Sequence, residues 1–334
     1  MKKRNSSRGF IFLLSLTSLM VLSSWGVWGH QRINKAAVFA LPEEMRSFFY
    51  NHIDFITEEA IVPDLRKYTL NDKAENPRHF IDIEEFGKSI DSIPRKMKEA
   101  SAAYEEKFLQ KNGILPWYIQ DVMEKLTKAF KEKKKTEILF LAGDLGHYLA
   151  DACMPLHTST NHDGQLTNQK GIHAFWESQL PELFGDKFNF NTDNAKYIDD
   201  VTKETWRIIT SSHQLVDTLL AVDKNLKATF PEDKIFKKDE SGNLLKNKYN
   251  QPVHTMEYAT KFHEQLKGMV ERQMRTAITA ASNYWYTAWV NAGKPDLNTL
   301  DDPELAAQNK KSLEKDFDSW KKGKLTKVKT ENEF

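Results

Sequence analysis

The stretch "GDLGHYLADACMPLHTSTNHDGQLTNQKGIHAFWES" spans residues 143–178 and holds four of the ten histidines of the chain. Two of these histidines precede a carboxylate by four positions, as His147 with Asp151 and His173 with Glu177. Residues four apart lie on the same face of an α-helix, so each pair can direct an imidazole and a carboxylate toward one ion. Such ligands suit zinc or a similar divalent metal. The stretch therefore predicts helices that carry metal ligands.

A third histidine lies between the two pairs. His157 follows Asp151 by six residues and comes just after Pro155, which ends the helix and lets the chain bend toward the same pocket. The polar, glycine-containing stretch 158–171 is typical of a loop over a site. One histidine–carboxylate pair is more often a surface hydrogen bond, but two pairs around a third histidine favour metal binding. His162, within the loop, is expected to be solvated.

Helical periodicity dominates the rest of the chain. Apolar residues recur three and four positions apart, and strand-like alternation is nearly absent. The segments expected to be helical are 41–60, 93–113, 116–155 with a break near 133–135, 197–226, and a long helix over about 255–292. Residues 235–253, with Gly242 between short polar and apolar runs, are expected to form a surface hairpin or loop. The sequence thus predicts an all-α fold, a single multi-helix domain with one small hairpin or loop insertion.

The N-terminus differs from the rest of the chain. "MKKRNSSR" is cationic, "GFIFLLSLTSLMVLSS" is apolar, and Ser23 and Ser24 offer a cleavage point, which predicts a signal peptide and a secreted or periplasmic protein. An N-terminal membrane anchor is the alternative, but a bilayer span needs about 20 apolar residues. After cleavage no transmembrane anchor is expected. The predicted regions are a signal peptide 1–24, a helical domain 25–293, and a charged C-terminal extension 294–334, partly mobile.

Composition limits the function classes further. The 334-residue chain is 40% hydrophobic and 28% charged, as is ordinary for a globular protein. Removal of residues 1–24 changes its formal net charge from +1 to −3, so the mature chain has no overall basic field for polyanions. Cys153 is the single cysteine; it cannot form an internal disulfide and is expected to be a small buried residue. No stable protein partner is implied.

Two upstream segments add further metal-type residues, "WGVWGH" at 25–30 and "VPDLRKYTLNDKAENPRHFID" at 62–82. With them, the chain resembles the superfamily of zinc-dependent phospholipases C and single-strand-specific zinc nucleases, which hold three zinc ions in a mostly helical domain. All nine ligand types of that superfamily occur in order, over at least residues 25–180. They are Trp25, His30, Asp64, His79, His147, Asp151, His157, His173 and Glu177.

The resemblance also implies how three Zn²⁺ ions would share these ligands. Asp64, His79, His147 and Asp151 would hold one zinc. Asp151 would bridge to a second, which His30 and the α-amino and carbonyl groups of Trp25 complete. His157, His173 and Glu177 would hold a third, more open zinc. Asp82 and Asp64 are the expected catalytic carboxylates, Asp82 by assisting the attacking water; for Asp82 a capping or ligand-orienting role is the alternative.

The resemblance leaves two substrate classes. Glu177 as last ligand and the absence of disulfides resemble the bacterial phospholipases, whereas the short Trp25 to His30 spacing and the sequence "HFID" resemble the nucleases. Phe80 would stack on a base or belong to the core, and Asn168 is a second expected substrate contact. We predict a zinc phosphodiesterase acting on single-stranded nucleic acid or 3′-nucleotides, with phospholipase C as the alternative. A non-catalytic zinc-binding module is a second alternative, but three protein ligands leave the third zinc open.

Overall fold

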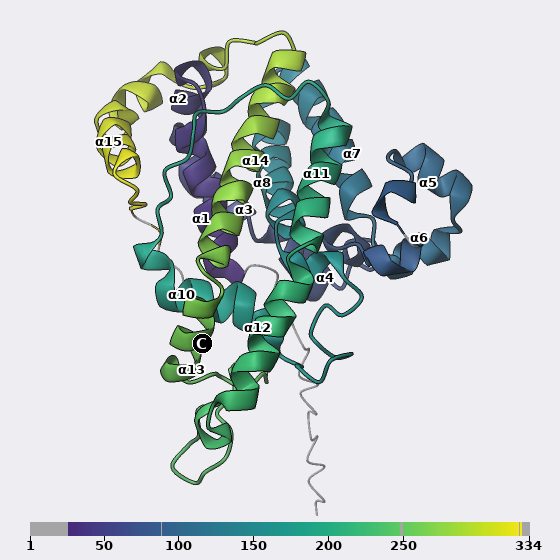
Figure 1. Cartoon of the computed structure of the whole chain (residues 1–334). Helices are drawn as coiled ribbons and strands as arrows, with labels where there is room; N and C mark the ends of the chain where they lie inside the picture. The colour runs from purple at the N-terminus through teal and green to yellow at the C-terminus, as the bar shows by residue number, and fades with distance from the viewer. Residues whose placement is uncertain (1–25, 88, 248–249, 327, 329–334) are drawn as a thin grey trace, which may run out of the picture.

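The computed structural model describes residues 26–87, 89–247, 250–326 and 328 (Figure 1). The predictions for residues 1–24 and for Trp25 lie outside these residues. The described residues form helices and no β-strand, as predicted. The α-helices are α1 (Gly26–Ala40), α2 (Glu43–Asn51), α3 (Ile53–Glu59), α4 (Val62–Tyr68), α5 (Met97–Ala103), α6 (Glu106–Asn112), α7 (Leu115–Lys131), α8 (Lys135–Ala152), α9 (Ile172–Ala174), α10 (Leu180–Phe184), α11 (Val201–His213), α12 (Val216–Thr229), α13 (Met256–Gln265), α14 (Met269–Asn291) and α15 (Pro303–Lys321).

Shorter helical turns connect these elements and carry several functional side chains. The 3₁₀ turns are η1 (Asn76–His79), η2 (Ile83–Phe86), η3 (Ile90–Ser92), η4 (Pro155–Thr158), η6 (Gly185–Lys187), η7 (Glu232–Lys234) and η8 (Asn298–Leu300), and η5 (Phe175–Gln179) is a π-helical turn between α9 and α10. Among the described residues, no helix combines the length and apolarity that a bilayer span requires.

The long helix α14 runs through the middle of the molecule (Figure 1) and packs against α1, α8 and α7. Its Trp285 is fully buried and stacks on Phe49 of α2, with ring centroids 5.3 Å apart. The indole Nε1 of Trp285 donates a hydrogen bond to the carbonyl of Ala142 in α8, at 2.9 Å. The buried aromatic face of α14 therefore ties α2 and α8 into one apolar core.

Two glycines let other helices approach α8 closely. A Cβ atom at Gly146 would lie 2.0 Å from Oδ1 of Asn34 in α1, and one at Gly143 would lie 2.4 Å from Cγ of Glu59 in α3. Asn34 uses this closeness to donate a hydrogen bond from Nδ2 to the carbonyl of Gly143, at 3.0 Å. Glycine at both positions thus fixes α1 and α3 against the helix that carries the first histidine–carboxylate pair.

Several expected helices are divided. The break near 133–135 is confirmed between α7 and α8, where Lys133 adopts a left-handed conformation. The prediction of a single helix over about 255–292 was wrong. Lys267 (φ +51°) and Gly268 (φ +76°) both adopt left-handed conformations and separate α13 from α14. His52, with φ −117°, likewise separates α2 from α3.

The expected hairpin or loop insertion is present as a projecting loop beyond α12 and α13 (Figure 1). Three isolated antiparallel bridges hold it, namely Phe236 to His254, Lys238 to Leu244 and Lys246 to Pro252. His254 pairs with Phe236 in this loop, where its ring stacks on Phe175 at 3.6 Å between centroids.

The C-terminal region contains the helix α15, which the charge-rich sequence did not suggest. The Asp302 side chain caps its start by accepting from the Glu304 N–H. On its buried face, Asp316 accepts a 2.7 Å hydrogen bond from the Tyr50 hydroxyl, and the Trp320 indole donates to the carbonyl of Phe190 at 2.8 Å. The first contact holds α15 against α2, and the second holds it against the segment that follows η6.

Candidate metal centre

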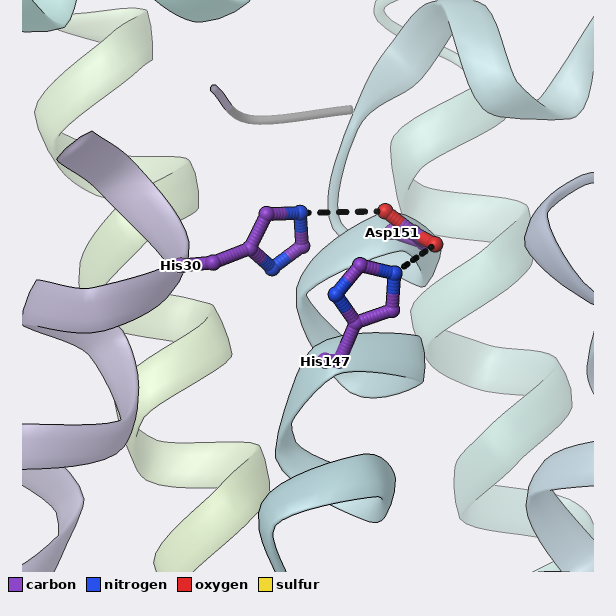
Figure 2. Close-up of side chains that lie close together, drawn as sticks. All are labelled: His30, His147 and Asp151. Atoms are coloured by element: carbon purple, nitrogen blue, oxygen red, sulfur yellow. Dashed lines mark ion pairs between the residues drawn. The ribbon is translucent and has the colours of Figure 1, made fainter. Parts of the chain in front are cut away.

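Asp151, at the last turn of α8, is the carboxylate around which the candidate centre is arranged. It is fully buried, as are His30 of α1 and His147 one turn earlier in α8. Figure 2 shows both imidazoles directed at its carboxylate. His30 Nε2 lies 3.5 Å from Asp151 Oδ1, and His147 Nε2 lies 3.2 Å from Oδ2. The two residues four apart on α8 therefore share one face, as expected, and α1 supplies a third ligand.

A second cluster shares His147 with the first. His79, at the end of η1, places Nδ1 3.0 Å from Asp151 Oδ2, 3.1 Å from His147 Nε2 and 3.6 Å from Asp64 Oδ1. Asp64 comes from the first turn of α4. Ligand atoms of Asp64, His79 and His147 all lie within 4.8 Å of one another, as do those of His30, His147 and Asp151. One ion could contact each of these sets.

The third cluster consists of His157, His173 and Glu177. His173 Nε2 lies 3.0 Å from Glu177 Oε1 and 3.3 Å from His157 Nε2, and His157 Nε2 lies 3.5 Å from Glu177 Oε2. Glu177 lies in the π-helical turn η5, a local widening that often occurs at functional sites. Three protein ligands leave room for water or substrate on a tetrahedral metal.

Backbone carbonyls orient three of the imidazoles. Nδ1 of His147 lies 2.7 Å from the Ala60 carbonyl, Nδ1 of His157 2.8 Å from that of His79, and Nδ1 of His173 2.8 Å from that of His162. A carbonyl can only accept, so each Nδ1 carries a proton, which leaves Nε2 as the atom that can bind a metal. This is the arrangement of histidines that bind metal, and the donor set fits zinc.

The orientation of His79 depends on Glu75, which the sequence reasoning did not select. Its Nδ1 faces the ligands, whereas its Nε2 lies 3.4 Å from Glu75 Oε1. Glu75 is itself fully buried and accepts hydrogen bonds from Arg66 Nε (3.1 Å), Arg78 Nη1 (2.9 Å) and the Tyr148 hydroxyl. Glu75 is thus a fixed carboxylate behind a ligand, which only its spacing of four residues before His79 could have suggested.

Charges within the centre influence its protonation. Burial lowers the pKa of His30 well below its usual value, and the neighbouring His147 lowers it further, so His30 is a neutral imidazole. Burial would also lower the pKa of His173, but the Glu177 carboxylate raises it to about 9. A metal must therefore displace a proton from His173, and we infer that metal affinity increases with pH across the neutral range.

A cavity of about 230 Å³ is lined by His79 of the second cluster and by His157 and His173 of the third. Phe80 and Asp82, predicted from the sequence as a substrate contact and a catalytic carboxylate, both lie in its lining. Asn168 is exposed, with a left-handed φ of +58°, and is absent from the lining. The lining residues are Lys67, Tyr68, Asn76, His79, Phe80, Asp82, Lys111, Leu156, His157, His162 and His173. The cations Lys67 and Lys111 were not selected from the sequence, because lysines at helix ends carry no distinguishing pattern.

Phe80 and Asp82 each had two interpretations. Phe80 lies at the cavity and outside the buried hydrophobic cluster, which favours substrate contact over core packing. Asp82 occupies the N-cap position of η2, but its side chain makes no capping hydrogen bond. Burial, followed by the charges of Glu84 and Glu85, raises the pKa of Asp82 to about 7. Asp82 is therefore suited to exchange a proton near neutral pH.

Comparison with known proteins agrees with this geometry. A family model described as zinc dependent phospholipase C matches residues 29–231, more than half of the chain. No curated protein sequence matches the chain. The matched residues include all the described members of the three clusters, from His30 to Glu177.

We predict that Asp151→Asn lowers the zinc content of the purified protein by more than one ion per chain, because the carboxylate lies within reach of two clusters. Zinc can be measured by plasma mass spectrometry after gel filtration. Asp223→Asn is the matched control, since Asp223 is equally buried but pairs with Lys227 and Tyr258. Equal zinc content in both variants and the wild type would contradict the shared-ligand arrangement.

Replacing Glu75 by Gln should weaken zinc binding at the His79 cluster by about 10- to 100-fold, as expected when the carboxylate behind a ligand is neutralised. Competition with a chromogenic chelator measures this affinity. Arg78→Gln is the control, because Arg78 contacts Oε2 of Glu75 and not the oxygen facing His79. A loss of affinity as large in Arg78→Gln would show that Glu75 acts only through general folding stability.

Proposed function

The chain belongs to the zinc-dependent phospholipase C family, and we propose that it is a three-zinc hydrolase that cleaves the phosphodiester bond of phospholipid head groups. The observation that carries this proposal is that two of the three histidine–carboxylate clusters place ligands, His79 and the pair His157 and His173, in the lining of one cavity. The cavity provides cationic, aromatic and acidic side chains. A phosphodiester with an amphipathic substituent requires all three kinds of contact.

In the proposed arrangement, Asp64, His79, His147 and Asp151 hold one zinc. His30 and Asp151 hold a second, whose remaining ligands would be the terminal amine and carbonyl of Trp25. The third is held by His157, His173 and Glu177. The distances among the described side chains support the sharing of Asp151 between the first two ions. The nitrogen of Trp25 would be a free amine only if Trp25 began the mature chain; in the uncleaved chain it is an amide nitrogen, which is a poor ligand. The second site would therefore need cleavage after Ser24, and we propose that the chain is exported.

Bound zinc would lower the pKa of water toward about 7 and stabilise negative charge on phosphate oxygens. The protein itself supplies the proton acceptor and the charges around the phosphate. Asp82 would accept the proton of the attacking water at the cavity wall. Lys67 lies in the same lining, where burial lowers its pKa and Asp64 and Asp151 counteract this effect. Lys67 and Lys111 would then bind non-bridging phosphate oxygens.

The aromatic residues bear on the substrate class. Tyr68 and Phe80 line the cavity beside Asp82. Aromatic faces attract quaternary ammonium groups, and a carboxylate adds to that attraction, which supports a choline-type head group. The family match favours the same substrate class.

A nuclease or 3′-nucleotidase is the second candidate, and it was the preferred prediction from the sequence. Phe80 supports it, because a ring outside the core and at the cavity can stack on a nucleobase. The lysines of the lining would serve a nucleic-acid phosphate equally well.

A substrate panel tests the proposal. Zinc-loaded protein beginning at Trp25 is expected to release phosphocholine from phosphatidylcholine faster than it cleaves single-stranded DNA, RNA or 3′-nucleotides. Phe80→Ala should reduce this activity far more than hydrolysis of bis-p-nitrophenyl phosphate, which lacks the head group. Cleavage of nucleic acid with no phosphocholine release would overturn the phospholipid assignment. If Phe80→Ala lowers the rates on phosphatidylcholine and on bis-p-nitrophenyl phosphate equally, Phe80 contributes packing and not head-group recognition.

The pH dependence should report Asp82. Its carboxylate must be ionised to accept a proton, so kcat/KM should increase with pH through the pKa of Asp82. Without metal that pKa is about 7. Bound zinc ions favour the ionised carboxylate, so in the zinc-loaded protein the apparent pKa should be at or below this value. Asp82→Asn should remove this acidic limb and lower the rate by roughly 10²- to 10⁴-fold. In Glu85→Gln the limb should shift to lower pH, because a charge that raises the pKa of Asp82 is removed. An unchanged limb in Asp82→Asn would assign the proton transfer to another group.

A further inference from the structure

A second cavity, of about 490 Å³, lies between α11, α14 and the segment 192–196. It shares no lining residue with the cavity at the metal centre. Its charged lining residues are Lys196, Arg207, Arg272 and Arg275 as cations, and Asp193 and Glu204 as anions.

Local ion pairs account for both anions. Arg207 donates to Glu204 from Nε and Nη2, at 2.7 and 2.6 Å, and Lys196 Nζ lies 3.3 Å from Asp193. Within the described part of the chain, no carboxylate forms an ion pair with Arg272 or Arg275. The cavity therefore has an excess of two positive charges, both on guanidinium groups.

The two guanidinium groups are also positioned in advance. Nη1 of Arg275 donates to the carbonyls of Asn189 and Asn191, at 2.6 and 2.5 Å, and Nη1 of Arg272 donates to the carbonyl of Lys267. A guanidinium has five N–H donors, so each retains further donors for a ligand. Because backbone carbonyls already restrain both side chains, a bound anion would lose less entropy in ordering them.

Neutral donors lie on the same face of α14 as the two arginines. Arg272, Arg275, Thr279 and Asn283 recur at helical spacing and all line the cavity. The side-chain oxygen of Asn283 accepts a hydrogen bond from the backbone N–H of Lys196 at 2.7 Å. This bond fixes the orientation of the side-chain amide and leaves its NH₂ group as a donor for a ligand. Planar guanidinium forks match phosphate oxygens better than they match spherical anions.

We propose that this cavity binds a phosphate-bearing molecule through Arg272 and Arg275, independently of the metal centre. Its volume of about 490 Å³ leaves room for a substituent beside the phosphate group, so the site suits an organic phosphate. The phosphate could belong to a small soluble ester or to a lipid head group, and the recognition chemistry is the same for both. The site does not depend on the proposed hydrolytic activity.

Titration calorimetry on the zinc-loaded protein tests the proposal, with glycerol 3-phosphate as soluble probe. We expect two binding events in the wild type, one at the metal centre and one at this cavity. The double variant Arg272→Gln/Arg275→Gln should lose one event and retain its rate on bis-p-nitrophenyl phosphate. Lys261→Gln, which removes an exposed cation of α13, should retain both events.

Flotation with phosphatidylglycerol vesicles distinguishes the two sources of phosphate. If the double variant loses binding of glycerol 3-phosphate, the ligand is a soluble phosphate ester. If it loses only the binding of vesicles, the ligand is a lipid head group. If the double variant matches the wild type with both probes, the proposal is overturned. If the double variant fails to fold, Arg272→Lys/Arg275→Lys replaces it in the test. An affinity for glycerol 3-phosphate or for the vesicles that is at least tenfold lower supports recognition by the guanidinium forks. Unchanged affinity for both probes refutes it.

Discussion

The fully buried carboxylate of Asp151 is the constraint on which the rest of the structure depends. Burial of an unpaired carboxylate is costly, because the interior does not replace its hydration. Burial alone would raise the pKa of Asp151, but the imidazoles of His147 and His157 hold it well below its usual range. The carboxylate therefore stays ionised only while protonated imidazoles from several segments surround it, or while metal cations bound by those imidazoles replace the protons. Folding and assembly of the metal centre are in this sense the same event.

This requirement explains why close helix packing occurs around α8. His30 reaches Asp151 from α1, and that approach is possible because Gly146 leaves no Cβ between Asn34 and the α8 backbone. On the other side, Trp285 fixes α14 against the carbonyl of Ala142. The apolar core thus sets the separation between helices, and the separation sets whether ligand atoms can share an ion. Substitutions far from the ligands can act on metal binding through this packing.

Charge is organised locally rather than over the whole molecule. The chain has a formal net charge of +1 with its first 24 residues included, yet the cavity at the metal centre has Lys67 and Lys111 in its lining, and the cavity along α14 has Arg272 and Arg275. Positive charge also recurs behind the ligands, where Arg66 and Arg78 donate to the Glu75 oxygen that faces away from His79. Anionic ligands would therefore be attracted at particular cavities and not by a general field.

The sequence by itself determined the helical class, the break near Lys133, the projecting loop, and the pairing of His147 with Asp151 and of His173 with Glu177. These features follow from local periodicity, since residues four apart share a helical face whatever surrounds them. The ligands from distant segments were foreseen only through a family resemblance, and Trp25 lies outside the described residues. Tertiary structure alone decided that Tyr148 of α8 donates to Glu75 behind His79, that Lys67 reaches the cavity, and that α15 packs on α2. Each of these depends on contacts between segments far apart in the chain, for which the local pattern carries no signal.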